Sequence, residues 1–297
     1  MKRIAFEEMA AGLVIDRVIR DYEYTMPTKH FHNEYEIYYL LEGERYYFIE
    51  KETYYVKKGS LVFVNHNQIH KTGFVGKSFH DRILIELKEE PFASFFLLTK
   101  TLSLSQFFSQ YYGVIELEEK DQKKVECLLF GIVKEIQNKT IGYEFMVQQK
   151  LAELLLLALR KKHENGLLVK GSTAKTSKHL KVHEVANYII NNSKDCSSLD
   201  ALSKQFFVSK CYLSRIFKEV TGFTVNEYIN IHRIQKAQEL LINSEYNITE
   251  ISELLGYESI TYFEKVFKKY TETTPLKYRK KHTVRNLKRD KKVEVVT

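Results

Sequence analysis

The sequence has 297 residues, of which 44% are hydrophobic and 28% are charged, which indicates a folded protein of about two domains. Its three widely separated cysteines exclude a disulfide framework and are typical of a reducing compartment. The longest purely apolar run, residues 154–159, is too short to span a membrane, and Glu7 and Glu8 stand where a signal peptide is apolar. We therefore expect a cytoplasmic protein.

The net charge of +8 is unevenly distributed along the chain. Residues 1–166 contain 23 basic and 24 acidic residues, whereas residues 167–297 contain 23 basic and 14 acidic residues. This asymmetry favours binding of the second half to nucleic acid or to an anionic membrane surface. A basic domain that is merely solvated remains the alternative.

The first ninety residues have the pattern of short strands. Residues 36–41, 45–49 and 61–64 are rich in Tyr, Phe, Ile and Val, and the dipeptides Glu42-Gly43 and Lys58-Gly59 punctuate them. Such closely spaced strands predict an antiparallel sandwich or barrel.

Helical periodicity begins near residue 121. Apolar residues recur at helical spacing over 125–136, and a second helix is predicted over 143–163 with a leucine-rich centre at 151–159. This centre is compatible with a helix–helix dimer seam and equally with the core of its own domain.

The residues that follow, 164–178, combine Gly, Ser, Thr and Lys and are predicted to be a flexible linker. We therefore divide the chain into a first domain (1–163), the linker (164–178), a basic second domain (179–282) and a basic tail (283–297).

The second domain contains a repeat of about fifty residues, in which Tyr212 matches Tyr262 and Phe217 matches Phe267. Each copy has the pattern helix, tight turn, helix, and residues 225–242 form a long helix between the copies. Candidate caps stand at the predicted helix starts: Ser198, Ser209, Asn247 with Glu250, and Ser259.

The second helix of each copy is amphipathic. The side predicted to be buried carries Tyr212, Leu213, Ile216 and Phe217 in the first copy and Tyr262, Phe263, Val266 and Phe267 in the second. The outward side carries Lys210, Cys211, Ser214, Arg215 and Lys218, or Ile260, Thr261, Glu264, Lys265 and Lys268. This is the layout of a DNA recognition helix, and two such helices held ~34 Å apart would enter successive major grooves. The alternative is a helical bundle that binds no nucleic acid.

Further motifs extend this pattern. They are Val208-Ser209 with Tyr212 to Lys218, Gly222, Tyr228-Ile229, Arg233-Ile234, Gly256-Tyr257, Tyr262-Phe263, Phe267-Lys268-Lys269, Thr274-Pro275 and Tyr278-Arg279. With these motifs, residues 197–279 resemble the AraC/XylS family of bacterial transcription regulators. Three residues depart from the family pattern: Ser203 and Ser252 replace a frequent alanine, and Glu272 replaces a usual glycine.

The resemblance implies that both outward faces read DNA. Arg215 is the candidate for bidentate contact with guanine, with a phosphate contact as its alternative. Ile260 is a candidate for contact with a thymine methyl group, and Glu264 either accepts from cytosine or is a solvated charge. Lys218 and Lys268 are expected to contact phosphates.

Two further basic features have alternative roles. Arg233 is expected to form an internal salt bridge in preference to a DNA contact. The run from Arg279 into the tail either contacts phosphates or is a disordered charged end.

In the first domain, His30, His32, Glu36 and Gly43 resemble the first cupin motif, and Gly59 to His70 resembles part of the second. Residues 30, 32 and 36 have the same parity, so on a strand they would share one face. With His70 they form a donor set that suits Mn, Fe, Ni or Zn. A metal-dependent cupin enzyme fused to a helical module is therefore the alternative function.

Cupin-like domains in the regulator family usually resemble effector-binding barrels, so we expect no enzyme activity and no cofactor. The predicted effector-binding residues are His30, His32, Glu36, Tyr38 and His70, and an aromatic wall of this kind suits a sugar or another small polar molecule. Parity leaves open which of residues 46–48 point inward. His66 and His80 are expected to be surface or core histidines.

Together these observations predict an α+β protein with an N-terminal cupin-like β-barrel, a helical dimerisation segment and an all-α domain with two helix-turn-helix motifs. The resemblance implies an effector-responsive regulator, usually an activator, that binds promoter DNA. Its expected partners are RNA polymerase, a small-molecule effector and a second copy of the chain.

Overall fold

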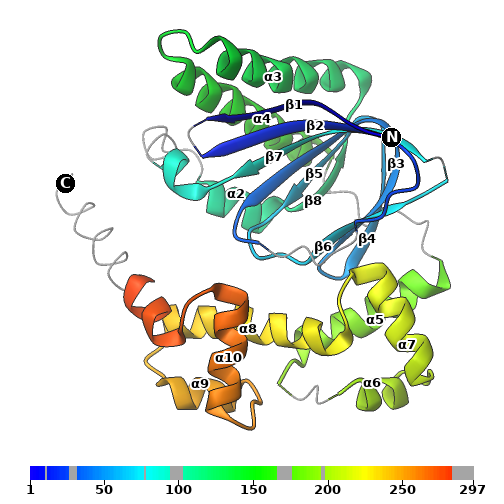
Figure 1. Cartoon of the computed structure of the whole chain (residues 1–297), viewed down its shortest axis with the longest axis vertical. Coiled ribbons are helices and arrows are strands. Elements are labelled where there is room, and N and C mark those ends of the chain that lie inside the picture. The colour runs from blue at the N-terminus through cyan, green and yellow to red at the C-terminus, as the bar shows by residue number, and fades with distance from the viewer. Residues whose placement is uncertain are drawn as a thin grey trace. The chain divides into compact units, whose positions relative to one another are not determined.

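The computed structural model describes residues 1–10, 12–26, 32–76, 78–93, 103–165, 176–194 and 198–282 (Figure 1). The chain divides into two compact units between Leu180 and Lys181, with Val220–Gly222 grouped with the first unit. The first unit contains all the strands and the second is helical, which confirms the α+β fold class. None of the described helices combines the length and apolar character that a membrane crossing requires.

The first unit is built on an antiparallel sheet. Its strands are β1 (Lys2–Ala10), β2 (Leu13–Asp21), β3 (Tyr35–Ile49), β4 (Glu52–Lys57), β5 (Ser60–Val64), β6 (His70–Phe74), β7 (Phe79–Leu87) and β8 (Gly113–Glu116). The order is β1-β2-β7-β3-β5-β8, and β4 and β6 both pair with β3. Over the described residues this path ends at β1 and β8 without joining them, and β3 also pairs with β4 and β6, so the strands form two layers joined through β3, in agreement with the antiparallel sandwich or barrel that we predicted.

Strand β3 connects two sheets. Its first part, Glu36–Tyr39, pairs with β5 and with β7, whereas Glu44–Ile49 pairs with β4. Between them the register with β7 shifts and Gly43 has φ +99°, where a Cβ atom would lie 2.4 Å from the Phe79 carbonyl oxygen. The turn predicted at Glu42-Gly43 is therefore wrong: this glycine permits a bulge that redirects one continuous strand.

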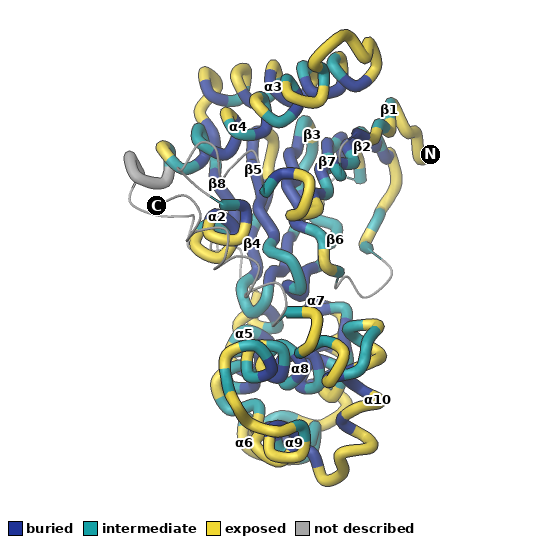
Figure 2. Tube along the Cα trace, turned by 90° about the vertical axis from the view of Figure 1, so that its left-hand side faces the viewer, coloured by how far each residue is buried: buried dark blue, intermediate teal, exposed yellow. Residues whose placement is uncertain are grey.

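In the described part of the chain, one face of the sheet is covered by helices α2 (Leu104–Tyr111), α3 (Glu119–Asn138) and α4 (Tyr143–Asn165). Figure 2 shows that the buried side of α3 and α4 alternates with an exposed side along each helix. The odd-numbered β3 residues Tyr35, Ile37 and Tyr39 pack with buried α3 and α4 residues, including Leu151 and Leu154. The leucine-rich centre of α4 therefore belongs mainly to the core of its own unit.

The second unit contains α5 (Ser177–Asn191), α6 (Leu199–Gln205), α7 (Lys210–Thr221), α8 (Val225–Asn243), α9 (Ile248–Leu254) and α10 (Ile260–Thr271). Helix α8 runs from the helices of the first copy to those of the second (Figure 1). The predicted caps are confirmed at all four helix starts, because the side chains of Ser198, Ser209, Asn247 and Ser259 each accept a backbone N–H. These caps fix where each helix begins, and hence which side chains face outward.

One predicted core position in α10 is wrong. Tyr262 is 52% exposed, whereas Phe263, Val266 and Phe267 are buried. These three residues complete the stripe at positions i, i+3 and i+4 that packs on the rest of the unit. The ring of Tyr262 lies outside this stripe, with its centroid 6.1 Å from that of Tyr257.

Arg233 binds backbone carbonyl groups within the helical domain; the internal salt bridge that we expected for it stays a prediction. Its guanidinium donates to three carbonyl groups, those of Ser193 (2.8 Å), Lys194 (3.1 Å) and Gly256 (3.1 Å). These bonds tie α8 to the segment after α5 and to the turn before α10.

Arg279 also faces inward, unlike the solvated or phosphate-binding residue that we predicted. Its Nε donates to the Leu241 carbonyl at 3.1 Å and its Nη2 to the Tyr246 carbonyl at 2.5 Å. These two bonds satisfy carbonyl groups at and just beyond the end of α8.

Glu272 ends α10 in the left-handed region, with φ +59° and its N–H donating to the Lys268 carbonyl at 2.9 Å. Fifty residues earlier, the equivalent position after α7 is Gly222, with φ +86°. The two copies of the repeat therefore use the same backbone conformation, but only the first has the residue that adopts it without strain.

We expect Glu272→Gly to raise the free energy of unfolding of the second unit by about 0.5–1 kcal/mol, because it relieves a left-handed non-glycine residue. Glu264→Gly, in the middle of α10, is the matched control and should lower it by about 1 kcal/mol. Chemical denaturation of the full chain measures both values. A destabilising Glu272→Gly would contradict the assigned strain.

Candidate DNA-binding surface and interior cavity

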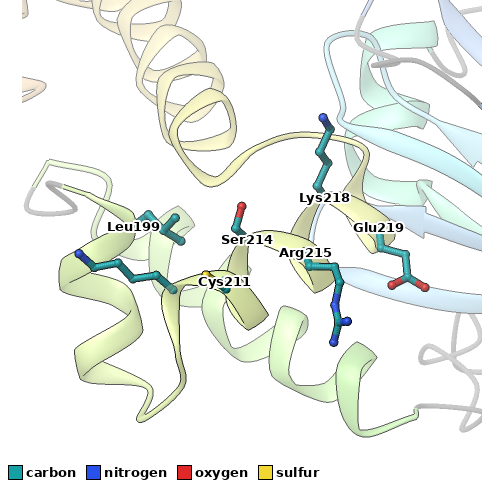
Figure 3. A pocket seen from close by; sticks show the side chains of 7 residues that line it. Leu199, Cys211, Ser214, Arg215, Lys218 and Glu219 are labelled. Atoms are coloured by element: carbon teal, nitrogen blue, oxygen red, sulfur yellow. The ribbon is translucent and has the colours of Figure 1, made fainter.

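The predicted residues of the first recognition helix share one face of α7. Lys210, Cys211, Arg215 and Lys218 are exposed and Ser214 is half-buried. Together with two further residues, Leu199 and Glu219, all five line one open hollow of about 660 Å³ (Figure 3). The hollow is lined by α7 along its length and bordered by the start of α6.

Acidic groups that the sequence interpretation did not include accompany this surface. The Lys210 ammonium lies 2.5 Å from one carboxylate oxygen of Asp200, and Lys204 lies 3.0 Å from the other. Hydrogen bonds from Lys210 and Lys204 lower the pKa of Asp200. The charge of Lys210 is thus partly balanced within the protein by Asp200. The guanidinium carbon of Arg215 lies 5.8 Å from the Tyr212 ring centroid, so the positive charge of Arg215 contributes more to this surface than that of Lys210 does.

The predicted residues of the second recognition helix are likewise exposed on α10: Ile260, Thr261, Glu264, Lys265 and Lys268. Both α7 and α10 begin at a serine cap, so the first turn of each helix presents its side chains from a fixed starting point. The second face contains one carboxylate and one large apolar side chain among its five residues, and is therefore chemically unlike the first.

The first unit encloses a small cavity of about 50 Å³ between its two sheets. Its lining comes from β2, β3, β6 and β7 and from the segment after β2: Arg20, Tyr24, Met26, Glu36, Tyr38, Arg45, Tyr47, Thr72, His80, Arg82 and Leu84. Of the predicted effector-binding residues, Glu36 and Tyr38 line this cavity. His30 lies outside the described residues.

Two further predicted residues, His32 and His70, reach the cavity wall through Glu36. The same Glu36 oxygen lies 2.6 Å from His32 Nε2 and 3.1 Å from His70 Nε2. Burial alone would raise the pKa of Glu36, but the charge of His70 and the hydrogen bonds from both histidines outweigh it, so that pKa lies well below its usual range. Tyr47 donates to the second carboxylate oxygen at 3.3 Å.

The ligand atoms of His32, Glu36 and His70 all lie within 4.8 Å of one another. This grouping agrees with the metal-ligand pattern of the sequence. In the structure, the Nε2 atoms of both histidines are hydrogen-bonded to Glu36. The three residues are therefore chemically suited to a metal, and equally to a hydrogen-bonded polar cluster.

The sequence interpretation missed the cationic side of the cavity. Arg20 and Arg45 are 7% and 1% exposed. His80, which we expected to be a surface or core histidine, is 2% exposed and lines the cavity. Burial lowers the pKa of His80 to about 4, and the charges of Arg45 and Arg20 add to this effect. In the sequence, these residues appear only as polar positions within strands. Polar positions in a strand normally indicate a side that faces solvent, so they did not predict a cavity.

The stability of the first unit should depend on pH through His80. In the folded state its pKa is about 4 against 6.5 for an unperturbed histidine, so the unfolded chain binds the proton more readily. This contribution is complete above pH 6.5 and decreases by about 3 kcal/mol as the pH falls to about 4.

His80→Gln keeps an acceptor for Arg20 but removes the titration. Denaturant unfolding across this pH window should therefore show a smaller pH dependence in the variant than in the wild-type chain. An identical dependence in both proteins would show that His80 is not held neutral by its surroundings.

The structure thus defines a two-domain protein: a β-domain with a polar interior cavity, followed by a helical domain that presents two capped recognition-type helices. Two family models match these parts. An AraC-like ligand binding domain matches residues 13–133, and a helix-turn-helix domain matches residues 202–281.

Individual relatives match in the same regions. The chain is 38% identical over 98 residues to the xylose operon regulatory protein of Escherichia coli K12, covering 33% of this chain but only 24% of that protein. It is 34% identical to the probable transcription factor PqrA of Proteus vulgaris, covering 29% of this chain and 70% of PqrA. The HTH-type regulator YdeC of Bacillus subtilis is 26% identical over 84% of this chain and 85% of its own. The chain therefore belongs to the AraC/XylS family of transcription regulators, as its motifs predicted.

Proposed function

We propose that this chain is a transcription regulator that binds promoter DNA through α7 and α10 and responds to a small molecule bound in the cavity of the β-domain. The observation that carries the proposal is the gathering of Lys210, Cys211, Ser214, Arg215 and Lys218 along one open face of a capped helix. The repeat, the basic charge of the second half and the family membership support it.

The proposed mechanism is a coupling between the two domains. An effector that binds one conformation of the chain more tightly than another favours that conformation. The effector then changes the affinity for DNA by the coupling free energy between the two sites, typically ~1–3 kcal/mol. In this proposal the regulator acts as an activator in the cytoplasm, with RNA polymerase as its partner on the promoter.

Homodimerisation is part of the proposal. Most leucines of α4 are used in the core, so they do not provide the dimer seam. Phe145 on α4 is 60% exposed, whereas Phe130 on α3, which is 38% exposed, lies against Phe6 and Arg17 of the sheet. A dimer through the outer side of α4 would use Phe145.

The DNA-binding function is tested by gel shift on the DNA upstream of the chain's own coding sequence. Arg215→Lys keeps the charge but loses the planar fork, so specific affinity should fall by about 1–3 kcal/mol while non-specific affinity is unchanged. Lys218→Ala should weaken binding to all sequences and reduce the salt slope by about one.

Lys236→Ala is the control, because this exposed lysine lies on α8 and pairs with Glu239 at 2.5 Å. It should leave both the affinity and the salt slope unchanged. Failure to retain either the upstream DNA or any member of a genomic library would contradict the proposed function.

The metal-dependent enzyme remains the second candidate because His32, Glu36 and His70 lie together. If the chain is a regulator, EDTA should leave its unfolding temperature and its DNA affinity unchanged. If it is an enzyme, metal analysis should find stoichiometric Mn, Fe, Ni or Zn that is lost in Glu36→Gln, a variant that retains hydrogen-bonding capacity at this position.

A further inference from the structure

The cavity of the β-domain has an unusual charge balance. Three of its lining residues are arginines, and an arginine side chain stays protonated even when it is buried. Transfer of such a charge out of water is costly unless an opposite charge and hydrogen bonds accompany it. The partners of each arginine therefore indicate whether the protein itself completes the site.

Two arginines, Arg17 on β2 and Arg82 on β7, have carboxylate partners. Arg17 forms two hydrogen bonds with Asp81, of 3.0 Å and 2.6 Å, and Arg82 pairs with Asp16. Arg17 points toward α3, where its guanidinium carbon lies 5.7 Å from the Phe130 ring centroid. The strands β2 and β7 thus supply an acid for each of these two cations.

Arg20 and Arg45 differ from these two residues. Among the described residues neither forms an ion pair with a carboxylate, although both are more than nine-tenths buried. Arg20 Nε and Arg45 Nη1 are buried N–H groups without a hydrogen-bond partner. Burial is the main cause that lowers the pKa of Arg45; the charge of Arg20 lowers it further, while the interactions with Tyr38 and Tyr24 raise it.

The groups around the two guanidinium ions compensate for their burial only in part. The Tyr24 ring lies 4.0 Å from the guanidinium carbon of Arg20, and the Tyr24 carbonyl accepts from Arg45 Nη2. Arg20 Nη1 lies 3.3 Å from His80 Nε2, which is a neutral contact because the pKa of His80 is about 4. The one carboxylate lining the cavity, Glu36, is engaged by His32 and His70.

We propose that the effector is a small organic acid and that its carboxylate binds between Arg20 and Arg45. A carboxylate presents two oxygens in one plane, which matches the fork of a guanidinium group. The cavity of about 50 Å³ has room for a group of a few heavy atoms, which suits a planar carboxylate better than a tetrahedral phosphate ester. The hydroxyl of Tyr38, which also lines the cavity, is a donor for a further oxygen of a hydroxylated acid, whereas the Tyr47 hydroxyl donates to Glu36.

This inference rests on the proposed function, because it specifies the chemical class of the effector. The inference predicts that an acid binds more tightly than a neutral sugar of the same shape. The binding energy would come from two charge-assisted contacts that the ligand-free protein leaves unmade.

The test uses the full chain and three pairs of conditions at equal ionic strength. Thermal unfolding and the ring signals of His80 in NMR spectra are followed with sodium acetate against sodium chloride, glycolate against ethylene glycol, and lactate against propane-1,2-diol. We expect each carboxylate to raise the unfolding temperature and shift the His80 signals more than its neutral or chloride counterpart does. Inorganic phosphate is added as a fourth probe.

Variants identify the site. Arg45→Met and Arg20→Met should each weaken carboxylate binding about tenfold or more. Neither should destabilise the ligand-free chain strongly, because each removes an unpaired buried charge. Arg17→Met is the matched control: it leaves Asp81 without its partner and lowers stability, but it should retain the response to carboxylates.

Three results would overturn the inference: no carboxylate acts differently from chloride, the neutral compounds act as well as the matched acids, or phosphate acts and carboxylates do not. Retained carboxylate binding in both Arg20→Met and Arg45→Met would also overturn the inference. If one of these variants does not fold, retained binding in the other is enough to overturn it. The gel shift on the same samples separates this inference from the proposed function. Specific DNA binding without a carboxylate response refutes only the inference, whereas loss of specific DNA binding refutes the regulator itself.

Discussion

The bend within β3 is the constraint on which the β-domain depends. One strand of fifteen residues pairs with β5 and β7 over its first part and with β4 and β6 over its second. The backbone changes direction where Gly43 approaches the Phe79 carbonyl too closely for any side chain. Because the two sheets share this strand, they are held face to face, and the space between them becomes the cavity.

The same bend decides which side chains enter the cavity. Before it, the even-numbered residues Glu36 and Tyr38 face inward, and after it the odd-numbered residues Arg45 and Tyr47 do so. A bulge adds one residue to the count along a strand, and so it reverses the alternation. The cavity consequently combines the carboxylate of Glu36 from the first part of β3 with the buried cation Arg45 from its second part.

In the helical domain, by contrast, interactions between residues close in sequence determine most of the structure. Each recognition helix starts at a serine cap, and α8 starts with the reciprocal capping box of Thr224 and Glu227. The two copies even end their second helices in the same left-handed conformation, at Gly222 and Glu272. Local hydrogen bonds therefore position the outward faces, and long-range contacts such as those of Arg233 hold the copies together.

The sequence by itself determined the α+β class, the two helix-turn-helix units, their caps and the outward residues of α7 and α10. Helical periodicity and capping act within a few residues, so a single chain displays them directly. It also placed Glu36 and Tyr38 on one face, since alternation holds along an uninterrupted strand.

Only the tertiary structure decided what the polar positions of β2, β7 and the end of β3 do. An arginine at an inward-facing strand position has the same sequence pattern as one that faces water, because alternation alone does not show whether the polar side of a sheet is covered. Arg20, Arg45 and His80 became cavity residues only when the bend in β3 placed a second sheet over them. Likewise, the leucines of α4 were compatible with a dimer seam until their packing against β3 and α3 was known. In each case the deciding quantity was burial by a segment distant in sequence.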